Sequence, residues 1–193
     1  LFIHIQMSIF VGVALSLLVF LYRTSNPELR RRVPDPMSSN RKFTDVRPDL
    51  PECPQFHLLR LDGALYFGAV ASFRDSMRKL EAEAPNCKQI AIVMTGVNFI
   101  DLAGAEALAL EARKLRARGG GLYLIRLKER ASEFLARGEY VDMIGRDNMF
   151  NSKTSALREI YRHLDYDICR QCKLRVFVEC ARLGKQEPRE DDD

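Results

Sequence analysis

The first 22 residues form an uncharged segment in which His4 and Gln6 are the only strongly polar side chains. They read LFIHIQMSIFVGVALSLLVFLY and contain no Lys, Arg, Asp or Glu. About 20 apolar residues are enough for a helix to cross a bilayer, whereas a surface helix of a soluble protein has one polar face. The pattern therefore predicts a transmembrane helix over residues 1–22. Gly12 and Ser16, four residues apart, could let another membrane helix approach closely, but both residue types are also common in membrane helices.

Basic residues follow this segment and none precedes it. Arg23, Arg30, Arg31 and Arg32 come first, and Arg41 and Lys42 are further along. A cleaved signal peptide has its positive charge before the apolar run. Positive charge next to a membrane helix favours the cytoplasmic side, so we expect the remainder of the chain to lie in the cytoplasm.

Residues 23–54 are rich in arginine and proline. Proline interrupts both helices and sheet ladders, so this stretch is predicted to be an extended or turned linker. A folded domain is predicted over residues 55–165, and a cysteine-containing tail over residues 166–193.

Alternating strands and helices are predicted for the domain. Residues 56–61 are typical of a strand, Asp62-Gly63 of a hairpin turn, and residues 64–67 of the returning strand. Apolar residues at 70, 73, 77, 80 and 84 predict an amphipathic helix. The continuous apolar run at 89–94 is typical of a central strand that is covered on both faces.

The second half of the domain continues this alternation. Asp101 is placed to cap a helix over residues 102–118, and glycines 119–121 should end that helix. A strand is expected at 122–127 and helices at 129–137 and 152–164. This order predicts an α/β domain with a mixed β-sheet flanked by helices.

Patterns of catalytic chemistry are missing from the sequence. The three histidines, His4, His57 and His163, do not form a hydrolase or metalloprotease motif. Glycines 119–121 follow a helix and precede a strand, the reverse of a phosphate-binding loop. A net charge of +4 is too small to indicate nucleic acid as a partner. We therefore expect a protein that is not an enzyme and needs no cofactor.

The sequence VNFIDLAG at residues 97–104 is the best candidate for a binding loop. A strand ends here and a helix begins, and the free N–H groups at a helix start can bind an anion or phosphate. An ordinary capped helix would leave the same pattern. The candidate residues for contacting a partner or an anion are Asn98, Asp101, Leu102, Ala103 and Gly104.

VNFIDLAGAEAL (residues 97–108) resembles the signature of STAS domains. This fold occurs in bacterial anti-sigma-factor antagonists and in the cytoplasmic tails of SulP-type (sulfate permease) transporters. The antagonists carry Asp-Ser-Ser/Thr-Gly, and a kinase phosphorylates the serine after the aspartate. Asp101 and Gly104 match this pattern, but Leu102 and Ala103 have no hydroxyl group, so phosphorylation at this loop is impossible. Transporter-type STAS domains often lack the serine.

Further segments look like bacterial SulP transporter tails. They are CPQFHLLRLDGALYFGAV (53–70), IVMTGVNFIDLAGAEAL (92–108), GGGLYLIRLK (119–128) and IGRDNMF (144–150). The resemblance implies the last membrane helix and the STAS domain of an anion transporter, in which the domain supports folding, trafficking and regulation of the transport core. One helix cannot enclose a transport path, because a polar substrate needs a site lined by several helices. The implied partners are the transport core or another protein, with a possible homodimer through the parent transporter. The alternative is a self-standing, membrane-tethered STAS protein that binds a partner.

Five cysteines complete the candidate chemistry. An odd number in a cytoplasmic domain argues against a disulfide framework. Cys169, Cys172 and Cys180 follow His163, and these four residues could hold zinc. A CxxC pair could also be a redox switch. A third possibility is that residues 174–178 simply dock on the domain and bury the cysteines.

Overall fold

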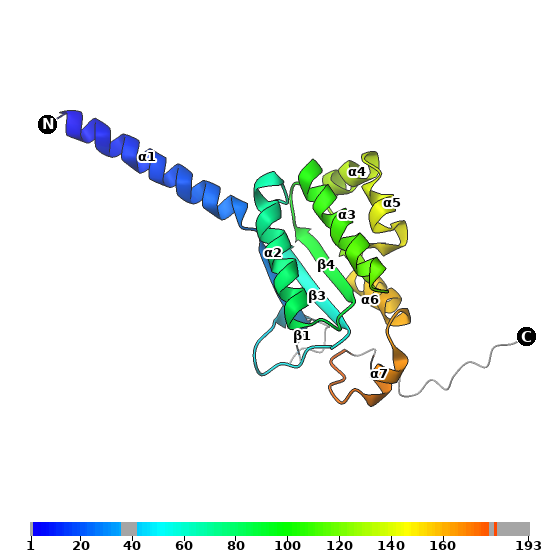
Figure 1. Ribbon diagram of the computed structural model, residues 1–193. Coiled ribbons are helices and arrows are strands. Elements are labelled where there is room, and N and C mark those ends of the chain that lie inside the picture. The colour runs from blue at the N-terminus through cyan, green and yellow to red at the C-terminus, as the bar shows by residue number, and fades with distance from the viewer. Residues whose placement is uncertain (1, 36–41, 178–179, 181–193) are drawn as a thin grey trace, which may run out of the picture.

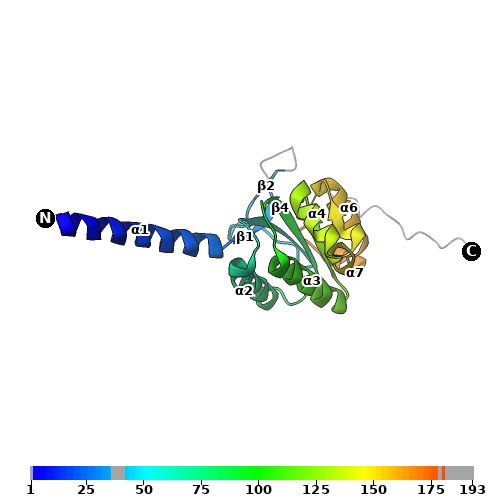
Figure 2. The same cartoon turned by 90° about the horizontal axis from the view of Figure 1, so that it is seen from above.

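A computed structural model describes residues 2–35, 42–177 and 180, as a long helix attached to a layered α/β domain (Figure 1). The helix, α1 (Phe2–Ser25), projects away from the domain in both views (Figures 1 and 2). Its part from Gln6 to Ser25 has a mean hydropathy of 1.8 and is not buried against the domain. This helix is therefore long and apolar enough to span a membrane, as the sequence predicted.

The domain is built on one six-stranded sheet in the order β2-β1-β3-β4-β5-β6. Strands β3 to β6 are parallel to one another, whereas β1 runs antiparallel to both β2 and β3. The strands are β1 (Glu28–Pro34), β2 (Phe43–Asp45), β3 (Phe56–Asp62), β4 (Gln89–Gly96), β5 (Gly121–Ile125) and β6 (Met149–Phe150). The helices of the domain are α2 (Phe67–Glu83), α3 (Leu102–Ala117), α4 (Glu129–Arg137), α5 (Tyr140–Ile144), α6 (Lys153–Arg162) and α7 (Tyr166–Gln171). The predicted mixed α/β fold is confirmed.

Alternating side chains of the sheet build two hydrophobic cores, one on each face. Leu59 and Leu61 of β3 contribute to the core under α2 and α3, while Phe56 and Leu58 contribute to the core under α6. Successive side chains of a strand point to opposite faces. Because both faces are covered, β4 and β5 are apolar along nearly their whole length.

The sheet begins well before residue 55, so the predicted start of the folded domain is wrong. Within the expected linker, β1 pairs with β3 from Glu28↔Asp62 to Arg32↔Leu58, and β2 pairs with β1. Pro27 precedes β1 and Pro34 ends it, which leaves the strand interior free of proline. The prolines therefore bound the strand instead of preventing it.

The returning strand predicted at residues 64–67 is also wrong. Gly63 has φ +120°, as a turn would require, but the chain then forms only an isolated parallel bridge, Leu65↔Ile100, and enters α2 at Phe67. The sheet is mixed because β1 is antiparallel, not because of a hairpin after β3.

Most of the local predictions for the second half are confirmed. Helix α4 has the predicted bounds, α6 begins after the cap Ser152, and α3 begins after the cap Asp101. The end of α3 is a Schellman motif, with Gly120 N–H donating to Leu115 O and Gly119 adopting φ +75°. The short helices α5 and α7 were not predicted.

Candidate functional site

The candidate loop lies at the edge of the sheet where the parallel strands end and where α2 and α3 begin (Figure 1). Asp101 is at the centre of this edge. Its Oδ1 accepts a hydrogen bond from the backbone N–H of Gly104 in the first turn of α3, at 2.9 Å. Its Oδ2 accepts one from the backbone N–H of Phe67, the first residue of α2, also at 2.9 Å.

Asp101 therefore caps two helices with one side chain. The residue before α2, Tyr66, makes no side-chain cap bond of its own, so the carboxylate from the other loop supplies the missing acceptor. A carboxylate also interacts favourably with the positive ends of two helix dipoles. Because this negative charge already occupies both helix starts, it disfavours the binding of a further anion at this loop.

Backbone hydrogen bonds hold the loop rigidly against the segment after β3. Leu65 N–H donates to Phe99 O at 3.0 Å, and Asp101 N–H donates to Leu65 O at 3.2 Å. Gly104 is required at this contact, because a Cβ atom there would lie 2.1 Å from Leu65 O. The glycine of the STAS-like pattern thus allows the start of α3 to approach the chain that leads into α2.

Three large apolar side chains are exposed around this capped edge. Phe67 is 81% exposed, Leu102 59% and Phe99 49%. We call these three residues the edge cluster. Phe67 and Leu102 are the first residues of α2 and α3, and the Asp101 carboxylate connects the two helix starts.

The remaining candidate residues have different surroundings. Asn98 is exposed, and its side-chain oxygen accepts a hydrogen bond from Lys128, which precedes α4. Ala103 is partly buried and packs against the core under α2 and α3, and Gly104 is buried. The loop therefore presents Asn98 and Leu102 to solvent, while Asp101, Ala103 and Gly104 shape it from within.

Phe67 was not predicted from the sequence as a candidate surface residue. It was assigned to a returning strand, whereas in the structure it is the most exposed of the large hydrophobic residues that are described outside α1. The sequence signal that was available is its place just outside the apolar stripe of α2, which begins at Val70.

Helix α1 leaves the domain next to this edge. The Ser25 hydroxyl at the end of α1 lies 3.4 Å from the Tyr66 hydroxyl, just before α2. Figure 1 shows the end of α1 beside the start of α2. If α1 crosses a bilayer, the edge cluster is on the side of the domain that faces it.

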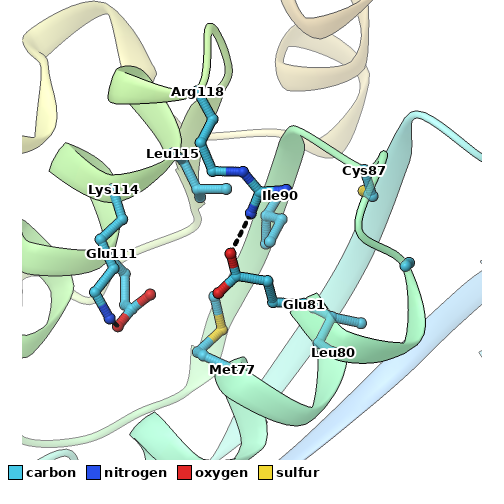
Figure 3. Close-up of a pocket in the computed structure, with 10 residues that line it drawn as sticks. Met77, Leu80, Glu81, Cys87, Ile90, Glu111, Lys114, Leu115 and Arg118 are labelled. Carbon is cyan, nitrogen blue, oxygen red and sulfur yellow. Dashed lines mark hydrogen bonds and ion pairs between the residues drawn. The ribbon is translucent and has the colours of Figure 1, made fainter.

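A small cavity lies at the opposite ends of α2 and α3 (Figure 3). Arg118 spans it, pairing with Glu81 at 2.6 Å and donating to Pro85 O at 2.5 Å. The buried Glu111 pairs with Lys114 at 2.8 Å. The cavity has a volume of only about 20 Å³, room for about one water molecule, so these residues tie the helices together and do not form a ligand site.

The four residues considered for zinc are not all brought together. His163 points to Glu159, with its Nε2 3.3 Å from the carboxylate, and its backbone carbonyl accepts from Gln89. Among the residues that the structure describes, no three His, Cys, Asp or Glu side chains stand ready to hold a metal ion. Cys169, Cys172 and Cys180 instead share a cavity with Cys53, which the sequence analysis did not include.

The thiols of Cys53, Cys87 and Cys169 are poor nucleophiles. Burial raises the pKa of the Cys53 thiol to about 11 and that of the Cys87 thiol to about 12, against weaker opposing hydrogen bonds from the backbone. Burial also raises the pKa of Cys169. Because the thiolate is the reactive form, the raised pKa of Cys169 disfavours it as the reactive thiol of the redox switch considered for the CxxC pair.

The family model of the STAS domain matches residues 47–156. The chain belongs to the STAS domain family. A probable sulfate transporter 4.2 from Arabidopsis thaliana is 24% identical over an alignment of 168 residues, and the match covers 78% of this chain and 24% of the transporter. The chain thus spans about a quarter of the length of this relative.

Solved structures share the fold. The murine Slc26a9 anion transporter, in an inward-facing state, matches 80% of this chain and 25% of its own length, with a TM-score of 0.65 and 21% identity. A sulfate transporter family protein from Wolinella succinogenes matches 67% of this chain and 97% of its own length, with a TM-score of 0.50 and 21% identity. The resemblance to transporter STAS domains is therefore confirmed.

Proposed function

We propose that this STAS domain is the cytoplasmic regulatory and interaction domain of a SulP-like transporter for sulfate or a related anion. It carries no catalysis and contacts the transmembrane transport core. The relationship to a plant sulfate transporter supports this proposal, and so does the small share of that protein that the chain spans. Substrate selection and transport would then be properties of membrane helices that this chain does not contain.

The cytoplasmic placement is supported by the charge that follows α1. Arg23 lies in the last turn of the helix, and β1 contributes Arg30, Arg31 and Arg32 within a short distance of it along the chain. Basic residues close to a membrane helix favour the cytoplasmic side. With α1 in the bilayer, the domain would lie directly beneath the membrane.

The single observation that carries the proposal is the edge cluster beside the end of α1. Large exposed apolar side chains that gather at one place mark interaction sites. The backbone that carries Phe67, Phe99 and Leu102 is held in place by the two hydrogen bonds of the Asp101 carboxylate and by the backbone hydrogen bonds of Leu65. A rigid apolar edge on the membrane side of the domain fits a contact with the transport core.

The test compares two exposed leucines in the full-length carrier, reconstituted in vesicles. Leu102→Ser removes an apolar side chain of the edge cluster, whereas Leu174→Ser removes one that is 51% exposed in the segment after α7. We expect Leu102→Ser to reduce sulfate uptake several-fold and Leu174→Ser to leave it unchanged. Both should leave the unfolding temperature of the domain within the range of ordinary surface substitutions.

Two results would overturn the proposal. One is unchanged uptake by the double variant Phe67→Ser/Leu102→Ser at equal amounts of carrier in the membrane. The other is an equal loss of uptake in Leu102→Ser and Leu174→Ser, since a contact at the edge cluster cannot explain both.

A further inference from the structure

Four of the five cysteines meet at one place, although they come from three separate parts of the chain. Cys53 lies before β3. Cys169 lies in α7, and Cys172 is the residue that caps the end of this helix. Cys180 lies eight residues further along the chain. All four line one cavity beside the core under α6. The fifth, Cys87, is buried on the other face of the sheet and lines the cavity between α2 and α3.

Phe177 brings the last of these cysteines into place. Its side chain is only 5% exposed, and its ring centroid lies 5.3 Å from that of Phe56 and 6.1 Å from that of Tyr161. Cys180 N–H donates to Phe177 O at 3.0 Å. The chain after α7 thus folds back on the sheet and carries Cys180 to the same edge as Cys53.

Polar groups of the domain are directed at the sulfur atoms. Gln55 Nε2 donates to Cys169 Sγ at 3.2 Å, and the backbone N–H groups of Gln55 and Phe56 donate to Cys53. The Tyr161 hydroxyl lies 3.7 Å from Cys180 Sγ. Hydrogen bonds of this kind orient the sulfur ligands of a metal site and stabilise their charge.

The size of the cavity limits what it can hold. Its volume is about 20 Å³, enough for one water molecule or one ion but not for an organic ligand. All four thiols are free, and Arg175 is the cationic side chain among the residues that line the cavity. A small cation that prefers sulfur ligands fits these conditions.

We propose that Cys53, Cys169, Cys172 and Cys180 bind one Zn²⁺ ion in a tetrahedral site. Four Zn–S bonds form, and the four thiol protons leave to solvent, so the site carries a net charge of −2. Arg175 at the cavity partly offsets this charge. In this proposal the fourth zinc ligand is Cys53, whereas the sequence had suggested His163.

Zinc binding must draw the four sulfur atoms closer together than they are in this structure. Among the described residues, no set of three or more potential ligands is already close enough to hold a metal ion. Zn–S bonds of about 2.3 Å place tetrahedral sulfur atoms about 3.8 Å apart. Cys172 ends α7, and residues 173–175 are exposed, so this part of the chain can move toward the cavity without disturbing the core. The ion would fasten the chain after α7 to the loop before β3.

The full chain, purified in detergent under reducing conditions and loaded with zinc, tests the proposal. Elemental analysis after dialysis should find about one zinc per chain, and Co²⁺ loading should give the charge-transfer and visible bands of a tetrahedral thiolate site. Cys53→Ser and Cys172→Ser should each abolish both signals. Cys87→Ser and His163→Ala should retain them, because neither residue is a ligand. Gln55→Ala should bind zinc about 10- to 100-fold more weakly through loss of its hydrogen bond to Cys169.

Three outcomes would overturn the proposal. The first is reduced full chain that retains no zinc and shows no thiolate bands with Co²⁺. The second is retention by Cys53→Ser together with loss by His163→Ala, which would assign the ligand set suggested by the sequence. The third is a disulfide among the four cysteines in protein from freshly lysed cells trapped with alkylating reagent. Circular dichroism of each variant shows whether a loss of metal reflects a lost ligand or an unfolded domain.

Discussion

Asp101 Oδ2 accepts a hydrogen bond from the backbone N–H of Phe67, 34 residues earlier in the chain, at 2.9 Å. This bond connects the start of α2 to the start of α3, which the same carboxylate also caps through Gly104. In the antagonist-type signature, the aspartate precedes a phosphorylated serine. Here it precedes Leu102, which has no hydroxyl, so its observed contribution is to hold two helix starts in register beneath an apolar surface.

Replacing Asp101 should therefore cost more than replacing an ordinary cap. Asp101→Ala removes two cap bonds and is expected to lower the free energy of unfolding by about 2 kcal/mol, since one cap contributes about 1 kcal/mol. Ser152→Ala is the matched control, because Ser152 caps only α6, by accepting from Ser155 N–H. Chemical denaturation of the full chain in detergent measures both. Equal losses in the two variants would show that the bond to Phe67 contributes nothing.

Gly104→Ala should destabilise the domain although alanine favours helices. The new Cβ atom would lie 2.1 Å from Leu65 O, so α3 or the chain before α2 must shift. We expect a loss of roughly 1–3 kcal/mol, typical of overpacking at a rigid site. Gly12→Ala in α1 meets nothing within 4 Å and is the control. An unchanged unfolding midpoint for Gly104→Ala would contradict the close approach seen here.

His57 should make the domain sensitive to mild acid. Burial, together with the charge of Arg31 and against that of Glu83, lowers the pKa of His57 to about 4. Its Nε2 has no hydrogen-bond partner, and its Nδ1 lies 3.5 Å from Glu52. The unfolded chain takes up this proton near pH 6.5, before the folded domain does. The neutral His57 therefore costs the domain no stability above about pH 6.5. As the pH falls from 6.5 toward 4, the free energy of unfolding decreases by about 3 kcal/mol in total.

Denaturation curves across this pH range measure the effect. His57→Leu should flatten the decline between pH 6.5 and 4, while His163→Asn, at the exposed histidine that ends α6, should leave it unchanged. A decline of the same steepness in His57→Leu would assign the acid sensitivity to other groups.

The size of the natural protein separates the two ways in which this domain could serve a membrane. An antibody raised against residues 55–164 should detect one membrane-bound band several-fold larger than 22.1 kDa, because the transporter relative is about four times as long as the matched region. A band at 22.1 kDa alone would contradict the transporter assignment and favour a self-standing, tethered STAS protein.

Local signals in the sequence determined the elements whose causes lie within a few residues. The uncharged run of α1, the apolar run of β4, the caps Asp101 and Ser152, and the glycines after α3 each act on neighbouring backbone groups. These signals were sufficient to predict α4 with its observed bounds and the start of α3 at Leu102. They also allowed the candidate loop to be located.

The tertiary structure decided what depends on partners far away in the chain. The sequence could not show that the arginine-rich segment before residue 55 would pair with β3, since a strand gains its hydrogen bonds only from the neighbour it meets. It could not show that Asp101 would reach Phe67, or that Cys53 would replace His163 beside the later cysteines. Each of these contacts forms only after the sheet has brought distant segments together, because side-chain contacts between such segments leave no periodic pattern in the sequence of either one.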